Sequence, residues 1–273
     1  VRLFAFGQAP VRAFLAEDDA DAATGPLALP LVLDREAYVK CAQRSMSGAT
    51  SRTQRSFVVS VLGPTHSGKT TLVNELRGHS TIDDDDDDDS HDDSIPTTAG
   101  VNCYEIPGGG GTLLDMEGDG GGNVLPADLR DELSSAQADT YFKQRRRASK
   151  EHLPRLAYVV SDVLVIMLTQ APADHEFYER AYKIAAVAAT HGVANARQPA
   201  LLLVANQTKD RKDADDVMPI EVSTRKFFDA HDQQRALLQS YRDVKLVRLP
   251  TYGYKRNEEL YYKQVERMRA QIA

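Results

Sequence analysis

The chain has 273 residues, of which 42% are hydrophobic, and this composition is that of an ordinary globular domain with an apolar core. Its formal net charge of -7 arises in one stretch, because nine of the 40 Asp and Glu residues lie at 83–89, 92 and 93, and the other 31 nearly balance 33 Lys and Arg. The charge therefore gives no reason to expect a nucleic-acid partner.

The cysteine content and the hydropathy pattern exclude two further classes. Two cysteines, Cys41 and Cys103, without a nearby set of histidines, favour neither a disulfide framework nor a zinc site. The longest apolar run, residues 156–168, is too short to cross a bilayer and contains Asp162. We expect a cytoplasmic protein. Because the chain begins with Val1 and ends on a charged helical pattern, we also expect it to be part of a longer protein, whose other regions would make any membrane contact.

The first part of the chain predicts little regular structure. Residues 1–28 are expected to form a loosely ordered N-terminal extension, and residues 29–273 one α/β domain. Within that domain, the apolar run 29–33 predicts a short strand, and residues 36–46 predict a helix. The β-branched run 57–62 predicts the first strand of the main sheet.

A phosphate-binding loop follows that strand. Residues 63–70 read Gly-Pro-Thr-His-Ser-Gly-Lys-Thr, which matches G-x-x-x-x-G-K-[ST], and the run 71–77 predicts the helix that should follow. Such a loop turns backbone N–H groups toward the phosphates of a nucleotide, and the helix N-terminus adds a positive dipole end. Lys69 would reach the β- and γ-phosphates, and the Thr70 hydroxyl would bind Mg²⁺. We expect nucleotide contacts from Gly63, Thr65, His66, Ser67, Gly68, Lys69, Thr70 and Thr71.

An acidic segment comes next, and a threonine pair follows it. Like-charge repulsion predicts that residues 82–94 form a disordered insertion. After it, Thr98 is the preferred candidate for a switch residue that binds Mg²⁺, with Thr97 as the alternative. Both hydroxyls could instead only shape a turn.

A hairpin carries the next candidate residues. The strands predicted at 101–106 and 112–116 are joined by Pro107 and four glycines, a connection too short for a crossover, so they should pair antiparallel at the edge of the sheet. The second strand leads into Asp115-Met-Glu-Gly118, a D-x-x-G pattern. Asp115 would hold Mg²⁺, and the Gly118 N–H would contact the γ-phosphate.

The remaining strands, predicted at 162–169, 200–205 and 244–249, complete an alternating α/β pattern. Before them, Arg145, Arg146 and Arg147 lie in a helical stretch that we interpret as a solvated face. After the strand 200–205, residues 206–210 read Asn-Gln-Thr-Lys-Asp, which is similar to the guanine-selecting N-K-x-D. Asp210 would accept both N–H groups of guanine, and Lys209 would stack along the base; a solvated loop is the alternative.

Together these elements predict a P-loop GTPase fold, with a mostly parallel sheet, one antiparallel edge hairpin and helices on both faces. The motifs resemble those of the G domain of the guanylate-binding protein and atlastin group of large, dynamin-like GTPases. The resemblance rests on Asp115-Met-Glu-Gly118, the Thr98-Ala-Gly-Val101 segment, Gln207-Thr-Lys-Asp210 and Arg225-Lys-Phe-Phe228, and it covers residues 29–273. It implies Mg²⁺-dependent hydrolysis of GTP coupled to homodimerisation through the G domain.

Two residues depart from the family pattern, and the first is Lys209, which stands where the resemblance implies an arginine. The second is His66, at the fourth position of the phosphate loop, where the resemblance also implies an arginine. We therefore expect Lys69, His66 and Thr98 to carry the chemistry, with the source of positive charge in the transition state left open. The first alternative is a pseudo-GTPase that binds GTP without turnover. The second, a P-loop ATPase or small-molecule kinase, would have no use for Asp210.

Overall fold

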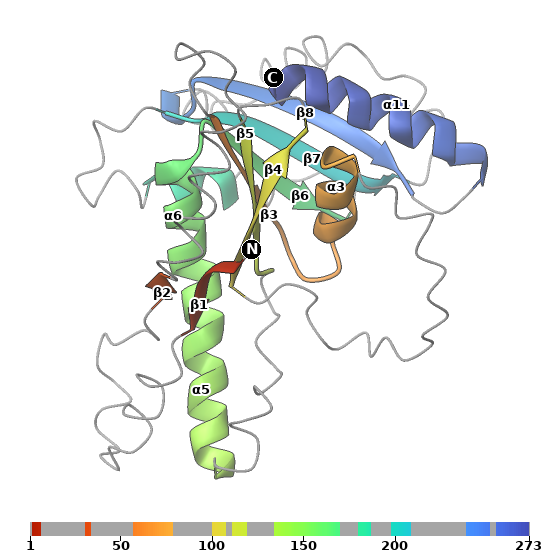
Figure 1. Cartoon of the computed structure of the whole chain (residues 1–273). Helices are drawn as coiled ribbons and strands as arrows, with labels where there is room; N and C mark the ends of the chain where they lie inside the picture. The colour runs from red at the N-terminus through yellow and green to blue at the C-terminus, as the bar shows by residue number, and fades with distance from the viewer. Residues whose placement is uncertain are drawn as a thin grey trace.

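The fold is organised around one mixed sheet (Figure 1). The computed structural model describes residues 2–6, 31–33, 57–78, 100–107, 111–118, 134–169, 180–186, 198–208, 239–251 and 255–272. Within these ranges the strands form an eight-stranded sheet in the order β2-β1-β4-β5-β3-β6-β7-β8. The predicted helix 36–46 and insertion 82–94 lie outside them.

Five strands form the parallel part of the sheet: β5 (Gly111–Met116), β3 (Phe57–Leu62), β6 (Val163–Leu168), β7 (Ala200–Thr208) and β8 (Asp243–Pro250). Each of them pairs parallel with its neighbours in this group. The β6 sequence Val-Leu-Val-Ile-Met-Leu is apolar at every position, as expected for a central parallel strand with both faces covered. The predicted strands of the parallel sheet are therefore confirmed.

The predicted hairpin is also confirmed. β4 (Val101–Ile106) pairs antiparallel with β5, and Ile106 lies opposite Gly111 at the turn. It does not form the edge of the sheet, however, because β1 (Arg2–Phe6) pairs antiparallel with β4, and β2 (Leu31–Leu33) pairs antiparallel with β1.

The placement of β1 corrects the prediction of a loosely ordered extension at residues 1–28 for its first residues. The sequence Arg-Leu-Phe-Ala-Phe at Arg2–Phe6 is rich in large apolar residues, and it adds a strand beside β4, whose outer edge would otherwise be unpaired. Residues 7–28 lie outside the described ranges. The domain boundary at residue 29 stays a prediction.

Helices cover both faces of the sheet (Figure 1). On one face, α3 (Lys69–Leu76) and α11 (Lys255–Ile272) pack against alternate residues of β3, β5 and β6. The buried helix residues recur at helical spacing, and they are Leu72, Val73 and Leu76 of α3 and Tyr261, Val265, Met268 and Ile272 of α11. On the other face, α6 (Leu153–Val160) and the helix at 180–186 pack against Leu164 and Ile166. The arrangement is consistent with the P-loop GTPase fold expected from the sequence.

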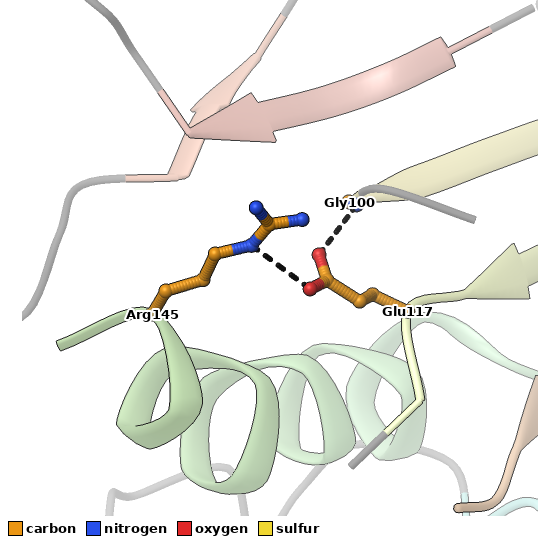
Figure 2. Close-up of polar contacts among 3 residues, drawn as sticks. All are labelled: Gly100, Glu117 and Arg145. Carbon is orange, nitrogen blue, oxygen red and sulfur yellow. Dashed lines mark hydrogen bonds and ion pairs between the residues drawn. The ribbon is translucent and has the colours of Figure 1, made fainter. Parts of the chain in front are cut away.

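A long helical segment precedes α6. α5 (Ser135–Arg147) continues through a π-helical stretch, η2 (Ala148–His152), into α6. Most of α5 projects beyond the sheet, while its last turns return to the edge where β5 ends (Figures 1 and 2). The prediction of a solvated arginine face holds for Arg146 and Arg147, which are exposed, but it is wrong for Arg145, which is buried.

Cys103 of β4 is buried, and the other cysteine of the sequence, Cys41, lies outside the described residues. Among the described residues, no helix is long and apolar enough to cross a membrane.

Candidate functional site

The phosphate loop connects β3 to α3 at the carboxyl edge of the parallel strands, which is the edge where α/β proteins bind ligands. The loop closes on itself, because the Ser67 N–H donates to the Pro64 carbonyl at 3.3 Å. Gly68 then caps α3 with φ of 85°, and its carbonyl accepts the Leu72 N–H at 3.0 Å. A Cβ on Gly63 would lie 2.5 Å from the Met167 carbonyl oxygen of β6, so only glycine fits there.

His66 lies at the tip of this loop. Its φ of 60° is a left-handed conformation, and no other non-glycine residue among those described has a positive φ. The side chain is exposed. A non-glycine residue in this conformation persists where its surroundings fix it, and such positions gather at ligand-binding sites.

Lys69 opens α3 and turns back into the loop. Its side chain is buried, with only 7% of the residue exposed, and Nζ donates to the Pro64 carbonyl at 2.7 Å. A buried ammonium group is costly unless it is bonded, so this contact fixes where the charge lies. Thr70 and Thr71, which follow it in the first turn of α3, are half-buried.

The D-x-x-G segment meets the loop from β5. Gly118 lies against it so closely that a Cβ would stand 2.6 Å from Lys69 Nζ and 2.7 Å from the Thr65 nitrogen. Asp115 is fully buried on β5. Leu113, two residues earlier, packs in the cluster that contains α3, and side chains two apart on a strand share a face. The Asp115 carboxylate therefore lies on the face of the sheet that α3 covers.

The pKa of Tyr104, on β4, is raised by its surroundings, which include Asp115. Burial, together with the Asp115 carboxylate, raises the pKa of Tyr104 above its ordinary value. Arg77 at the end of α3 lies over the Tyr104 ring, 4.0 Å from its centroid. The neutral phenol and the cation above it thus tie β4 to α3 beside the site.

Asn206 connects β7 to the phosphate loop. It is buried, with 6% exposed, and its Nδ2 donates to the Ser67 carbonyl at 2.8 Å. The pairing of β7 with β8 shifts here, because Ala205 pairs with Arg248 while Thr208 pairs with Pro250, so β7 contains one extra residue. A bulge of this kind redirects side chains. Sequence reasoning ended the strand at residue 205 and gave Asn206 no role of its own.

The described residues of the site suit a Mg²⁺ ion only in part. Asp115 offers a buried carboxylate and Thr70 a hydroxyl in the first turn of α3, which are the hard oxygen donors that Mg²⁺ prefers. Mg²⁺ commonly binds through one or two protein groups and the substrate phosphates. In the part of the chain that the structure describes, no cluster of three or more His, Cys, Asp or Glu residues could hold a metal. The third predicted ligand, Thr98, lies outside the described residues, as do Thr97, Lys209 and Asp210.

Glu117 and Arg145 were not predicted as site residues. The Glu117 carboxylate lies between the N–H of Gly100 and the guanidinium of Arg145, which approaches from α5 (Figure 2). The D-x-E-G pattern places Glu117 beside the site but does not indicate its partner. Arg145 lies 28 positions further along the chain, and no local signal in a single sequence pairs residues that far apart.

No protein-family model matches the sequence, and no curated protein matches it. Among solved structures, the chain is similar to the Arl6 BBS3 small GTPase from Trypanosoma brucei with the nucleotide analogue GppNp bound, at 14% identity and a TM-score of 0.36, covering 80% of this chain and 99% of that one. It is also similar to two mutation variants of SsGBP, at 15% and 13% identity and TM-scores of 0.35 and 0.34, covering 87% of this chain in both cases. The chain spans 65% of each SsGBP chain. At identities and TM-scores this low, these matches are similarities only, and they do not assign the chain to the guanylate-binding protein and atlastin group.

Proposed function

We propose that this domain binds GTP with Mg²⁺ and hydrolyses it to GDP and phosphate. The observation that carries the proposal is that Lys69 and Gly118 meet at one phosphate loop, with Asp115 buried on β5 three residues before Gly118. The loop follows a central strand and begins a helix, Lys69 is buried within it, and Gly118 lies against both. This is the order of elements and the set of groups that phosphoryl transfer from a nucleoside triphosphate uses.

Each group has a role in the proposed reaction. The backbone N–H groups of the loop bind the β-phosphate, and Lys69 stabilises negative charge on the γ-phosphoryl group. Thr70 and Asp115, with Thr98, would hold Mg²⁺, which would neutralise charge on the phosphates. The Gly118 N–H contacts the γ-phosphate. Water attacks the γ-phosphorus, the bond to the bridging oxygen breaks, and GDP and phosphate leave.

The choice of GTP over ATP depends on the segment after β7. Asp210 accepts both donors of guanine's edge, whereas adenine presents a ring acceptor there, and such a mismatch discriminates by about 10⁴-fold or more. The contact from Asn206 to Ser67 supports this part of the proposal, because it joins the strand that leads to Asp210 to the phosphate loop. Although residues 206–210 depart from N-K-x-D, the first of them, Asn206, is hydrogen-bonded to the phosphate loop.

The proposal must also account for the positive charge that stabilises the transition state. An arginine finger is worth about 10³- to 10⁵-fold in rate, and this loop has the exposed His66 instead. We propose that basal turnover is slow and that the G domain gains charge by homodimerisation in the triphosphate state. Specific activity would then rise with protein concentration.

A phosphate-release assay with GTP and ATP over a range of protein concentrations tests the function. We expect turnover of GTP only, an increase in specific activity with concentration, and loss of activity in Lys69→Ala. Asp210→Asn should reduce the preference for GTP. Equal turnover of ATP and GTP would contradict the nucleotide assignment. GTP binding without phosphate release at any concentration would establish the pseudo-GTPase alternative.

A further inference from the structure

The carboxylate of Glu117 is held between two donors from different elements (Figure 2). Oε1 accepts the Nε–H of Arg145 at 2.9 Å, and Oε2 accepts the N–H of Gly100 at 2.8 Å. The Glu117 side chain is 0% exposed and that of Arg145 is 6% exposed. Burying a carboxylate so completely is costly unless it is hydrogen-bonded and paired with a cation, so the position of Arg145 determines how Glu117 is oriented.

Gly100 depends on Glu117 for both of its backbone polar groups. Its N–H donates to the Glu117 carboxylate, and its carbonyl accepts the Glu117 N–H at 2.8 Å. Gly100 has φ of 78° and directly precedes β4, so the chain turns sharply here before it enters the sheet. Glu117 therefore fixes the point from which the segment before β4 departs.

Gly100 and Glu117 belong to the two segments that the proposed function places around the γ-phosphate. Gly100 is two residues after Thr98, the proposed switch residue. Glu117 lies between Asp115, the proposed Mg²⁺ ligand, and Gly118, which lies against Lys69. Arg145 belongs to neither segment, and it reaches the pair from the end of α5.

We propose that Arg145 is a positioning residue for the triphosphate state. Through Glu117 it holds Gly100, and with it the segment that carries Thr98, in register with the Asp115–Gly118 loop. This inference rests on the proposed function. Because GDP has no γ-phosphate, its binding depends on the phosphate loop and not on the register of these two segments. Loss of Arg145 should therefore weaken binding of the triphosphate and leave binding of the diphosphate nearly unchanged.

The experiment compares Arg145→Gln with the control Arg147→Gln, which makes the same change of charge two residues away on an exposed side chain whose contact is with Glu151. Calorimetric titrations measure the dissociation constants of GDP and of a non-hydrolysable GTP analogue with Mg²⁺. We expect Arg145→Gln to reduce the ratio of analogue affinity to GDP affinity by about 5- to 150-fold, the usual range for coupled sites. Arg147→Gln should change the ratio by less than about twofold. Arg145→Lys, which keeps the charge, should restore part of the loss.

Hydrogen exchange at the Gly100 amide gives a second readout that needs no nucleotide. In the nucleotide-free protein, Arg145→Gln should speed exchange of this amide, and Arg147→Gln should not. If Arg145→Gln does not fold, Glu117→Gln serves in its place, because it replaces one of the two accepting oxygens with an NH2 group, which cannot accept a hydrogen bond from its donor.

Equal loss of affinity for both nucleotides would overturn the proposal, since it would show that Arg145 only stabilises the fold. An unchanged ratio in both Arg145→Gln and Glu117→Gln would overturn it as well. If the unmodified protein binds neither nucleotide, the proposed function fails first, and the Gly100 exchange data then show separately whether Arg145 holds this segment.

Discussion

Gly118→Ala is the sharpest single perturbation of the phosphate loop. The added Cβ would lie 2.6 Å from Lys69 Nζ, 2.7 Å from the Thr65 nitrogen and 2.9 Å from the Pro64 carbonyl carbon. Ordinary contacts of a Cβ begin at 3.4 Å, so these atoms must retreat by about 0.5 to 0.8 Å. The lysine tip can move, but the other two atoms are backbone. The loop and the Asp115–Gly118 segment must therefore separate.

The expected effect follows from that displacement. Overpacking of this kind lowers the free energy of unfolding by about 1–3 kcal/mol. A misplacement of about 1 Å at a reacting group costs about 100-fold in rate, so we expect GTP turnover to fall by about tenfold to 100-fold. Phosphate release measures the turnover, and urea unfolding measures the stability.

Gly78→Ala is the matched control. Gly78 has φ of 73°, so alanine is strained there by about 1–2 kcal/mol, yet its Cβ would meet only Pro107 at an ordinary 3.7 Å. It should lower stability and leave turnover unchanged. Normal turnover in Gly118→Ala, or equal loss in both variants, would refute the argument that Gly118 must lie against the phosphate loop.

Three further changes test other parts of the structure. Asn206→Ala removes the hydrogen bond to the Ser67 carbonyl, so we expect the free energy of unfolding to fall by about 1–3 kcal/mol and calorimetry to show weaker GTP binding. Unchanged GTP affinity would show that this contact between β7 and the loop does not support nucleotide binding. Burial raises the pKa of Tyr241 well above its ordinary value, so the unfolded chain loses this proton first and stability should fall as pH rises above about 10. Tyr241→Phe, which also removes the bond to the Ala181 carbonyl, should show less of this alkaline loss, and identical slopes in the two proteins would contradict it. His66→Arg should raise GTP turnover at low protein concentration, and an unchanged rate would show that the missing charge does not belong at this position.

The sheet was predictable where local sequence determines it. The apolar, β-branched runs of β3, β6, β7 and β8 predict buried parallel strands, and the turn of Pro107 and glycines predicts the β4–β5 hairpin. The loop between β3 and α3 was predictable because its glycines, Lys69 and Thr70 occur at fixed spacing after a strand. In each case, the signal lies within a few neighbouring residues.

The parts that were missed depend on contacts between distant residues. Arg145, Arg146 and Arg147 are consecutive identical residues, so the sequence does not distinguish them. Only the position of Arg145 on α5 brings it to the buried Glu117. The strand β1 is short, and it forms because the outer edge of β4 accepts it. The bulge in β7 between Ala205 and Thr208 depends on the register with β8. A single sequence does not encode these pairings in any local pattern.

Calorimetric titration of GTP with Mg²⁺ into the unmodified domain and into Lys69→Ala tests the central claim most directly. The claim is that residues 63–70 bind the phosphates of a guanine nucleotide, with the buried Lys69 supplying the charge. We predict saturable binding of one GTP per chain in the unmodified domain, much weaker binding of ATP, and no measurable GTP binding in Lys69→Ala with its fold intact. Failure of the unmodified domain to bind GTP, or undiminished binding by Lys69→Ala, would contradict the account.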